Sequence, residues 1–287
     1  MKERFFVPIV KHLEDVDDLN YGRDAILVPE QYERAKNLAE DIYKTAIEGD
    51  YKILVFCISP KLRARGTADS ISDAIQEHPD APQIIKNTET ELREIDQGSF
   101  ILPENYKPGD KYDGLKIAGK IFSAETFKID PGGDNLDYHY GDPLPNVDGT
   151  YVHPELANYF TKSGESYREV LIRFYGEALK LSKHTKRFTD AKVLPVIFTH
   201  GQPHQIFSDL SAVAEMVKEE GFVLEPGKLP RLCWDIYNSR RKDIVPYGTL
   251  VQVSAEYLND PNMVALLQRE FDYLVKNIPV TTLKTSS

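Results

Sequence analysis

The segment ILVFCISPKLRARGTADSISDAI, residues 53–75, joins a strand pattern directly to a helix pattern. Its first six residues, Ile53–Ile58, form an unbroken apolar run, which is typical of a strand covered on both faces of a sheet. Ser59 and Pro60 end the run, and the residues Leu62–Ile75 that follow are predicted to form a helix. A buried strand followed at once by a helix indicates an α/β fold built on a parallel sheet.

The same alternation continues on both sides of this segment. Further strands are predicted at Phe5–Val10, Pro82–Lys86, Val193–Thr199 and Leu250–Ser254, and further helices after Pro29 and at Tyr167–Lys183, Ile206–Glu219 and Asn262–Lys276. The helix after Pro29 has apolar residues at helical spacing, namely Ala35, Leu38, Ala39, Ile42 and Ala46. We therefore predict a single domain over residues 1–287, a three-layer α/β sandwich with a mostly parallel central sheet flanked by helices.

Residues 99–164 do not follow this rhythm. They hold eight of the 17 glycines and six of the 18 prolines, and they show no clear periodicity. The segment is too long for an ordinary connection between two elements. We predict that residues 99–164 are an irregular insertion that forms a lid or a small subdomain.

Composition and charge restrict the class of protein. Apolar residues make up 41% and charged residues 28% of the 287 residues, which excludes disordered, collagen-like and disulfide-framework classes. The formal net charge of -10 disfavours nucleic acids and anionic membrane surfaces as partners. With no long apolar run and no signal peptide, we expect a cytoplasmic protein in which Cys57 and Cys233 are buried, reduced thiols.

Several chemically reactive or charged side chains follow the predicted strands. Lys11 and His12 come after the first strand, and Arg63 follows the strand Ile53–Ile58 after a short turn. Further along the chain are Glu94, after the third strand, and His200, after the fourth. Ligands of α/β sheets bind beyond the carboxyl ends of the strands, so we expect these side chains to form one site.

These residues lie in motifs that resemble those of the histidine phosphatase superfamily, the phosphoglycerate mutase-like proteins. The family reads Arg-His-Gly, then Ser-Pro-x-x-Arg-Ala-x-x-Thr-Ala, then Leu-x-Glu-x-x-x-Gly, and finally Thr-His-Gly. The matching residues here are Ser59, Pro60, Arg63, Ala64, Thr67 and Ala68 for the second motif, Leu92, Glu94 and Gly98 for the third, and Thr199, His200 and Gly201 for the fourth. The resemblance covers about Phe5 to Leu210 in the family's order.

The first motif departs from the family. Where the family has Arg-His-Gly, this chain has Lys11, His12 and Leu13. The lysine keeps the positive charge of the arginine but loses its bidentate fork. The leucine places a bulky side chain where the family's backbone approaches a phosphate.

The resemblance implies a metal-independent phosphomonoester hydrolase that acts on a small phosphorylated metabolite and needs no cofactor. His12 would attack phosphorus and carry the phosphohistidine intermediate, and Glu94 would act as general acid and then general base. Lys11, Arg63, His200 and Arg23 would bind the phosphoryl oxygens, with His200 also counted as catalytic. A metal held by His200 and His204 is disfavoured, because Pro203 is expected to start a helix between them.

Two other functions stay open at this point. The chain could be a degenerate member that binds a small ligand, or does other acid–base chemistry, without efficient hydrolysis. It could also be a phosphoglycerate-type mutase, although residues 99–164 supply only lysines and no arginine for a second phosphate. Arg65 is predicted to be a surface charge, Glu165 and Ser166 to cap a helix, and the region after Leu210 to pack on the insertion or form a homodimer surface.

Overall fold

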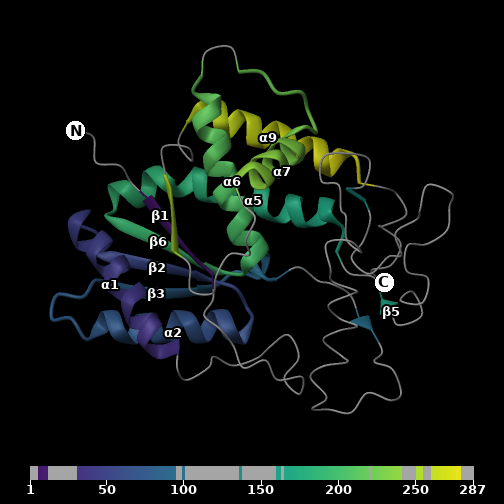
Figure 1. Ribbon diagram of the computed structural model, residues 1–287. Helices are drawn as coiled ribbons and strands as arrows, with labels where there is room; N and C mark the ends of the chain where they lie inside the picture. Colours follow the sequence, from purple (N-terminus) through teal and green to yellow (C-terminus); the bar gives the residue numbers. More distant parts are fainter. Residues whose placement is uncertain are drawn as a thin grey trace. The chain divides into compact units, whose positions relative to one another are not determined.

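A computed structural model of the chain describes residues 6–11, 31–94, 99–100, 136–137, 160–162, 165–219, 222–240, 250–254 and 260–278 (Figure 1). The chain divides into two compact units. The first comprises Met1–Glu94 and Arg173–Tyr273, and the second comprises Ile95–Ile172 and Leu274–Ser287.

The first unit contains a five-stranded sheet in the order β3-β2-β6-β1-β7 (Figure 1). The strands are β1 (Phe6–Lys11), β2 (Ile53–Ile58), β3 (Gln83–Thr88), β6 (Val193–Thr199) and β7 (Leu250–Ser254). Strands β3, β2, β6 and β1 run parallel, and only β7 is antiparallel to its neighbour β1. All five strands lie where the sequence predicts them, and the predicted α/β fold class is confirmed.

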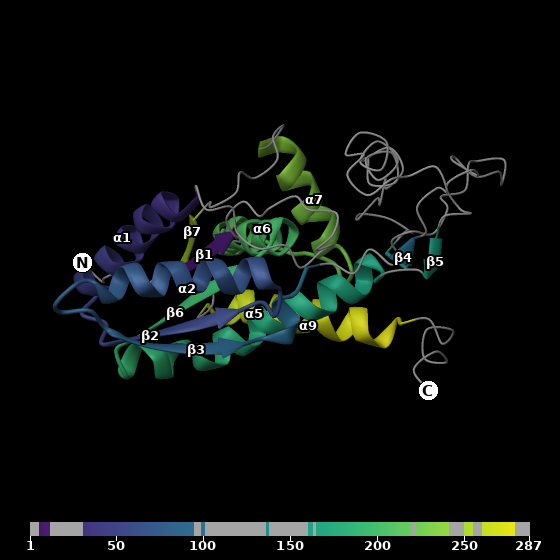
Figure 2. The same ribbon diagram turned by 90° about the horizontal axis from the view of Figure 1, so that it is seen from below.

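Helices cover both faces of this sheet. Helices α1 (Tyr32–Glu48) and α2 (Leu62–Gln76) pack on one face, and their apolar stripes form a core with inward side chains of β2 and β6. The buried residues of α1 are the five that helical spacing selects: Ala35, Leu38, Ala39, Ile42 and Ala46. The helix α5 (Tyr167–Asp190) lies on the opposite side of β2 and β3 from α2 (Figure 2). Phe174 of α5 contacts Phe207 of α6 (Gly201–Val217), so these two helices are neighbours.

The two central strands, β2 and β6, are buried to different extents. All seven residues of β6 are buried, as the prediction of a doubly covered strand requires. In β2 buried residues alternate with half-buried ones, because Val55 and Cys57 border a cavity beneath α5. The prediction of full burial is therefore confirmed for β6. For β2 it is confirmed only on the face that α1 and α2 cover.

The carboxyl-terminal part of the first unit contains one helix that the sequence patterns did not indicate. This helix, α7 (Leu229–Arg240), lies between α6 and β7 in the chain, and α9 (Pro261–Lys276) follows β7. The N–H of Gly227, in the turn before α7, and the N–H of Leu229, the first residue of α7, donate to Oε2 of Glu270 on α9, at 2.8 and 3.3 Å. Gly227 has φ +81°, and a Cβ there would lie 2.4 Å from Cε1 of Tyr273, so this turn requires glycine.

In the second unit, β4 (Ser99–Phe100) and β5 (Phe160–Lys162) pair antiparallel. The start of α5 forms a capping box, in which Ser166 Oγ accepts from the Glu169 N–H and the Ser166 N–H donates to Glu169 Oε2 at 2.7 Å. The predicted capping role of Ser166 is thereby confirmed. Most of residues 99–164 lie outside the described residues, and the lid or subdomain stays a prediction.

Candidate functional site

Three parallel strands end together at one edge of the sheet. Lys11, the last residue of β1, lies opposite Thr199, the last residue of β6, and Ile58 at the end of β2 lies opposite Phe198. The Ser59 N–H continues the ladder by donating to the Phe198 carbonyl at 3.0 Å. This register brings Lys11, Ser59 and His200 to the same edge, as expected for residues that follow parallel strands.

His200 is fully buried at the amino-terminal end of α6 and has a hydrogen bond on each ring nitrogen. Arg63 Nε donates to Nδ1 at 3.2 Å, and Ser59 Oγ lies 2.8 Å from Nε2. Because a guanidinium can only donate, Nδ1 must accept, which leaves the ring proton on Nε2 to be donated to Ser59. In this network Nδ1 of His200 is an acceptor and Nε2 carries the N–H that faces Ser59.

Arg63 connects this histidine to the carboxylate of the site. It is the second residue of α2, is 9% exposed, and places Nη2 3.3 Å from Oε2 of Glu94. The same carboxylate oxygen lies 3.4 Å from Nδ1 of His200. Arg65, two residues further along α2, is exposed, as predicted for a surface charge.

Lys11 brings a second buried cation to this edge. Its side chain is buried and lies against Gly201, where an added Cβ would be 3.7 Å from Nζ. Both α2 and α6 begin at this edge, so their amino-terminal N–H groups add partial positive charge. Two buried cations and two helix amino termini favour an anion with several oxygen atoms, of which a phosphoryl group is the common biological case.

The segment that carries Glu94 is tied to the sheet by its backbone. The Glu89 N–H donates to the Ile58 carbonyl at 2.8 Å, and the Thr199 hydroxyl donates to the Leu92 carbonyl at 3.0 Å. Leu92 is buried, whereas the Glu94 side chain keeps 22% of its surface exposed. Glu94 can therefore exchange protons with solvent while one of its oxygens faces Arg63 and His200.

The described residues thus bring together four of the side chains that the sequence selects, namely Lys11, Arg63, Glu94 and His200. His12, Leu13 and Arg23 lie outside the described residues. The sequence predicts no contact for Ser59 or Thr199, which stand there only as motif positions. The position of each residue in the sequence is the signal that could have indicated a role: Ser59 directly follows β2, and Thr199 is the last residue of β6.

The structure also bears on the metal prediction and on membrane association. Pro203 occupies the first turn of α6, where its missing N–H costs no helical hydrogen bond, so the helix already begins before His204. Within the described ranges, no three His, Cys, Asp or Glu side chains gather closely enough to hold a metal ion. None of the helices described is both long and apolar enough to cross a bilayer.

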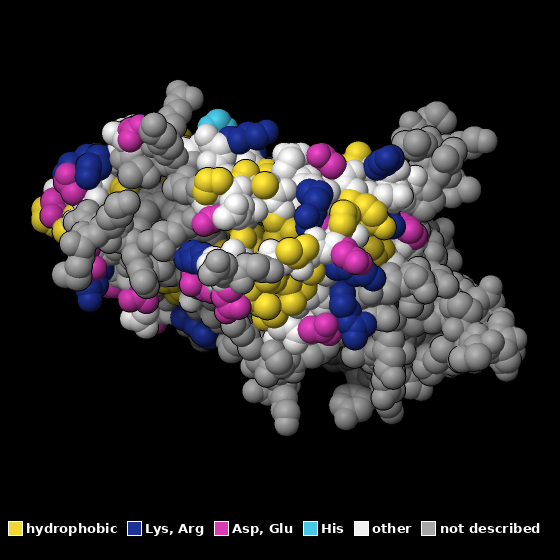
Figure 3. Space-filling view, turned by 90° about the horizontal axis from the view of Figure 1, so that it is seen from above, with side chains coloured by type: hydrophobic (Ala, Val, Ile, Leu, Met, Phe, Trp, Pro, Cys, Tyr) yellow, Lys and Arg dark blue, Asp and Glu magenta, His cyan; other side chains and the backbone are white. Residues whose placement is uncertain are grey.

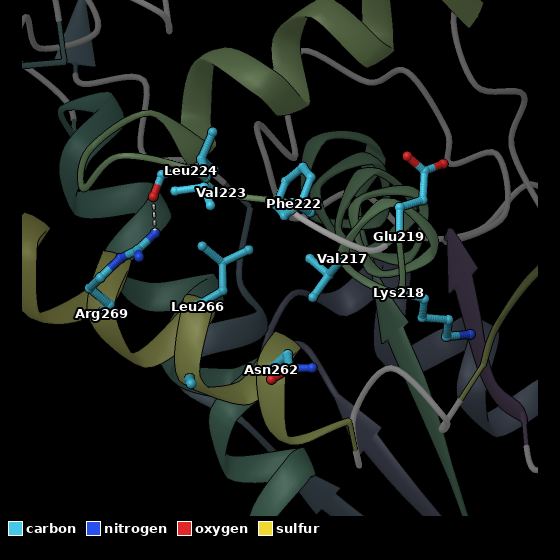
Figure 4. A pocket seen from close by; sticks show the side chains of 10 residues that line it. Val217, Lys218, Glu219, Phe222, Val223, Leu224, Asn262, Leu266 and Arg269 are labelled. Atoms are coloured by element: carbon cyan, nitrogen blue, oxygen red, sulfur yellow. Dashed lines mark hydrogen bonds between the residues drawn. The ribbon is translucent and has the colours of Figure 1, made fainter.

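Among the described residues of the first unit, cavities also lie away from this site. One of about 610 Å³ lies between the end of α6 and α9, with Val217, Phe222 and Leu266 around it and Arg269 bonded to the Leu224 carbonyl (Figure 4). Another, of about 360 Å³, lies between α5 and the β2–β3 face and includes Glu89 and Leu92. Neither is lined by Lys11, Arg63, Glu94 or His200.

Of the two cysteines, Cys233 is buried as predicted, whereas Cys57 is half-buried beside the cavity beneath α5. Burial raises the pKa of the Cys57 thiol to about 12, and burial also raises the pKa of Cys233. Both thiols are free and would be protonated at neutral pH, which makes them poor nucleophiles.

No family model matches the sequence, and no curated protein matches it. The fold is similar to solved structures at low identity. A mycobacterial glucosyl-3-phosphoglycerate phosphatase is 14% identical over 87% of this chain and 90% of that chain, with a TM-score of 0.46. The ecdysone phosphate phosphatase of Bombix mori, in complex with tungstate, is 17% identical over 87% of this chain and 88% of that chain, with a TM-score of 0.44.

A phosphoglycerate mutase from Bacillus anthracis is 15% identical over 93% of this chain and 98% of that chain, with a TM-score of 0.42. By their descriptions, these three neighbours are two phosphatases and a mutase. At such identities the likeness concerns the fold alone.

Proposed function

We propose that this protein is a metal-independent phosphomonoester hydrolase that acts on a small phosphorylated metabolite through a phosphohistidine on His12. The observation that carries the proposal is the cluster of Lys11, Arg63 and His200 at the amino-terminal end of α6, beside the partly exposed carboxylate of Glu94. The cluster combines fixed positive charge for phosphoryl oxygens with a carboxyl group that can transfer a proton.

In this mechanism a lone pair of the neutral His12 imidazole attacks phosphorus and the ester P–O bond breaks. Glu94 gives its proton to the leaving oxygen, so the product departs as an alcohol. Glu94, now ionised, then takes a proton from water, which attacks the phosphohistidine and releases inorganic phosphate. The carboxyl group ends in its starting protonation state, and His12 is regenerated.

The other residues bind the phosphoryl oxygens and stabilise their negative charge. Lys11 and Arg63 are cations held in place before the substrate arrives, so little reorganisation is needed as charge develops. His200 has its N–H at Nε2, and a phosphoryl oxygen could replace the Ser59 hydroxyl as its acceptor. Arg23, the remaining sequence candidate, is proposed as a further phosphate ligand.

The test is phosphate release from a panel of small phosphomonoesters at several pH values, in a buffer that contains EDTA. His12→Ala should abolish turnover, because the nucleophile is lost, whereas His184→Ala, which removes an exposed histidine on α5, should leave it unchanged. Hydrolysis that survives His12→Ala, or that EDTA removes, would contradict the proposal. The best ester would indicate the substrate class.

One observation favours a second candidate function, a degenerate enzyme that binds a phosphorylated ligand without efficient hydrolysis. The buried cation at the end of β1 is Lys11, which cannot grip two phosphoryl oxygens with a planar fork. Restoring the family's motif by Lys11→Arg with Leu13→Gly should raise hydrolysis in a degenerate enzyme. In a specialised hydrolase the same double change should leave activity unchanged or lower it.

A further inference from the structure

One buried arginine near the site has no part in the mechanism above. Arg173 on α5 is 7% exposed, and its Nη1 donates to two backbone carbonyls, those of Glu91 at 2.6 Å and Arg93 at 3.0 Å. The residue that follows Arg93 is Glu94, the proposed general acid. A buried guanidinium therefore holds the backbone immediately before the reactive carboxyl group.

The contacts of Arg173 combine with a contact from the opposite side of the segment. The carbonyl between its two acceptors, that of Leu92, accepts from the Thr199 hydroxyl at 3.0 Å. Thr199, the last residue of β6, directly precedes His200, so the same three-residue stretch is bonded both to α5 and to the end of β6. Hydrogen bonds to three consecutive backbone carbonyls, those of residues 91–93, thereby fix the position of the backbone directly before Glu94.

These bonds are stronger than those that hold an ordinary turn. A guanidinium is always charged, and a charge-assisted bond is about twice as strong as a neutral one. Its burial is costly unless its donors are satisfied, and two of its partners are carbonyls of this segment. On the same helix, Lys180 bonds the Glu89 side chain at 2.7 Å, which ties the start of the segment to α5 as well.

We propose that Arg173 is a positioning residue that sets the place of the Glu94 carboxyl group relative to Arg63 and His200. This inference rests on the proposed function, in which Glu94 protonates the leaving oxygen. A general acid must lie within hydrogen-bond reach of that oxygen, and misplacement by about 1 Å can cost about a hundredfold in rate. Arg173 does not touch the substrate in this proposal and acts only through Glu94.

The test measures how kcat/KM depends on the leaving group. Alkyl phosphates need a proton on the departing oxygen, whereas 2,4-dinitrophenyl phosphate does not. Glu94→Gln should therefore lower kcat/KM for an alkyl phosphate by about a hundredfold or more and spare the dinitrophenyl ester. Arg173→Met should show the same pattern at about tenfold, and Arg173→Lys, which keeps a donor and the charge, should recover part of the loss.

A matched control comes from the same helix. Arg168 is also 7% exposed and also binds a backbone carbonyl, that of Leu274, together with the Asp137 carboxylate. Arg168→Met removes an equally buried guanidinium that does not contact residues 91–93, so it should not change the leaving-group dependence. The double variant Arg173→Met with Glu94→Gln should be no slower on alkyl esters than Glu94→Gln alone.

Two outcomes would overturn the inference: an equal loss on all esters in Arg173→Met, which indicates general damage, or no loss on any. A separate readout applies if the wild-type protein hydrolyses no ester and the proposed function fails. Hydrogen exchange of backbone amides in residues 89–94 should then be faster in Arg173→Met and unchanged in Arg168→Met. Unchanged exchange in both would show that Arg173 does not hold the segment, whatever the protein's activity.

Discussion

At the scale of single residues, the two arginines of α2 provide a sharp test of the site. Arg63 is buried and bonded to both His200 and Glu94, whereas Arg65 is exposed two positions further on. A lysine at position 63 would keep the charge but could not reach both partners with a planar fork. We expect Arg63→Lys to lower kcat/KM by about a hundredfold, the usual cost of one lost oxyanion donor.

Arg65→Lys is the control for this prediction, because it makes the same chemical change on the same helix. It should leave kcat/KM within about twofold of the wild-type value, because the interactions of an exposed, solvated charge are weak. Equal effects of the two substitutions on phosphate release would contradict the assignment of Arg63 to the site. Thermal unfolding of both variants would check that neither has lost its fold.

The residues of the site differ in how far the sequence could predict them. Lys11, Arg63, Glu94 and His200 could be named because each follows a strand closely in the chain. Arg173 could not be predicted, because it lies 80 residues after Arg93, whose carbonyl it binds. Every residue type has a backbone carbonyl, so a contact to one cannot be recognised from the amino acids in the sequence. Contacts made through the main chain become visible only when the fold is known.

At the scale of helices and strands, prediction succeeded where burial imposes a regular pattern. The bounds of β2 and the five buried residues of α1 match the predictions, because side chains that face the core must be apolar. The sequence pattern predicts that α6 starts at Ile206, whereas the helix begins at Gly201, because its first turn is built from polar residues and Pro203. No pattern predicts the helix α7, because its first N–H group, that of Leu229, donates to Glu270, which lies 41 residues later in the chain.

The same Glu270 contact gives a pH-dependent prediction. Burial raises the pKa of the Glu270 carboxyl, and the N–H donors of Leu229 and Gly227 and the charge of Arg269 oppose that shift. The folded state therefore holds the proton more tightly than the unfolded state does, so this group contributes stability at low pH. The contribution is lost as the pH rises through the raised pKa.

Glu270→Gln cannot ionise but keeps an oxygen that can accept from both N–H groups. The unfolding midpoint of this variant, relative to wild type, should therefore rise when the pH is increased from about 4 to about 8. Differential scanning calorimetry across this range would measure it, with the exposed Glu215→Gln on α6 as the control for loss of a charge. A relative midpoint that falls with rising pH would show that the ionised carboxylate stabilises the fold.

At the scale of the whole molecule, the site is a local exception to the overall charge. The chain carries a net charge of -10, and the face in Figure 3 mixes Lys and Arg with Asp and Glu around a hydrophobic centre. Such a surface does not attract anions in general. We therefore expect an anion that stabilises the protein at constant ionic strength to bind where buried cations lie close together, as Lys11 and Arg63 do at the sheet edge.

Inorganic phosphate should consequently raise the unfolding temperature even if the enzyme turns over no substrate. The elements that carry Lys11, Ser59, Glu94 and His200 are β1, the β2–α2 turn, the 89–94 segment and the β6–α6 turn, so a bound phosphate would link parts that separate on unfolding. At about 100 times its dissociation constant, phosphate adds about 2.7 kcal/mol of stability. For a protein of this size that amounts to a shift of roughly 4–5 °C in the unfolding temperature.

The control is sodium chloride at the same ionic strength, and the matched variants are again Arg63→Lys and Arg65→Lys. Phosphate should shift the midpoint of Arg65→Lys as much as that of wild type and shift that of Arg63→Lys much less. An equal shift with chloride, or an undiminished shift in Arg63→Lys, would place the stabilising anion elsewhere. Because the measurement requires binding and not turnover, it separates the phosphate site from the chemistry: a degenerate enzyme would show the shift without hydrolysis, and an efficient one would show both.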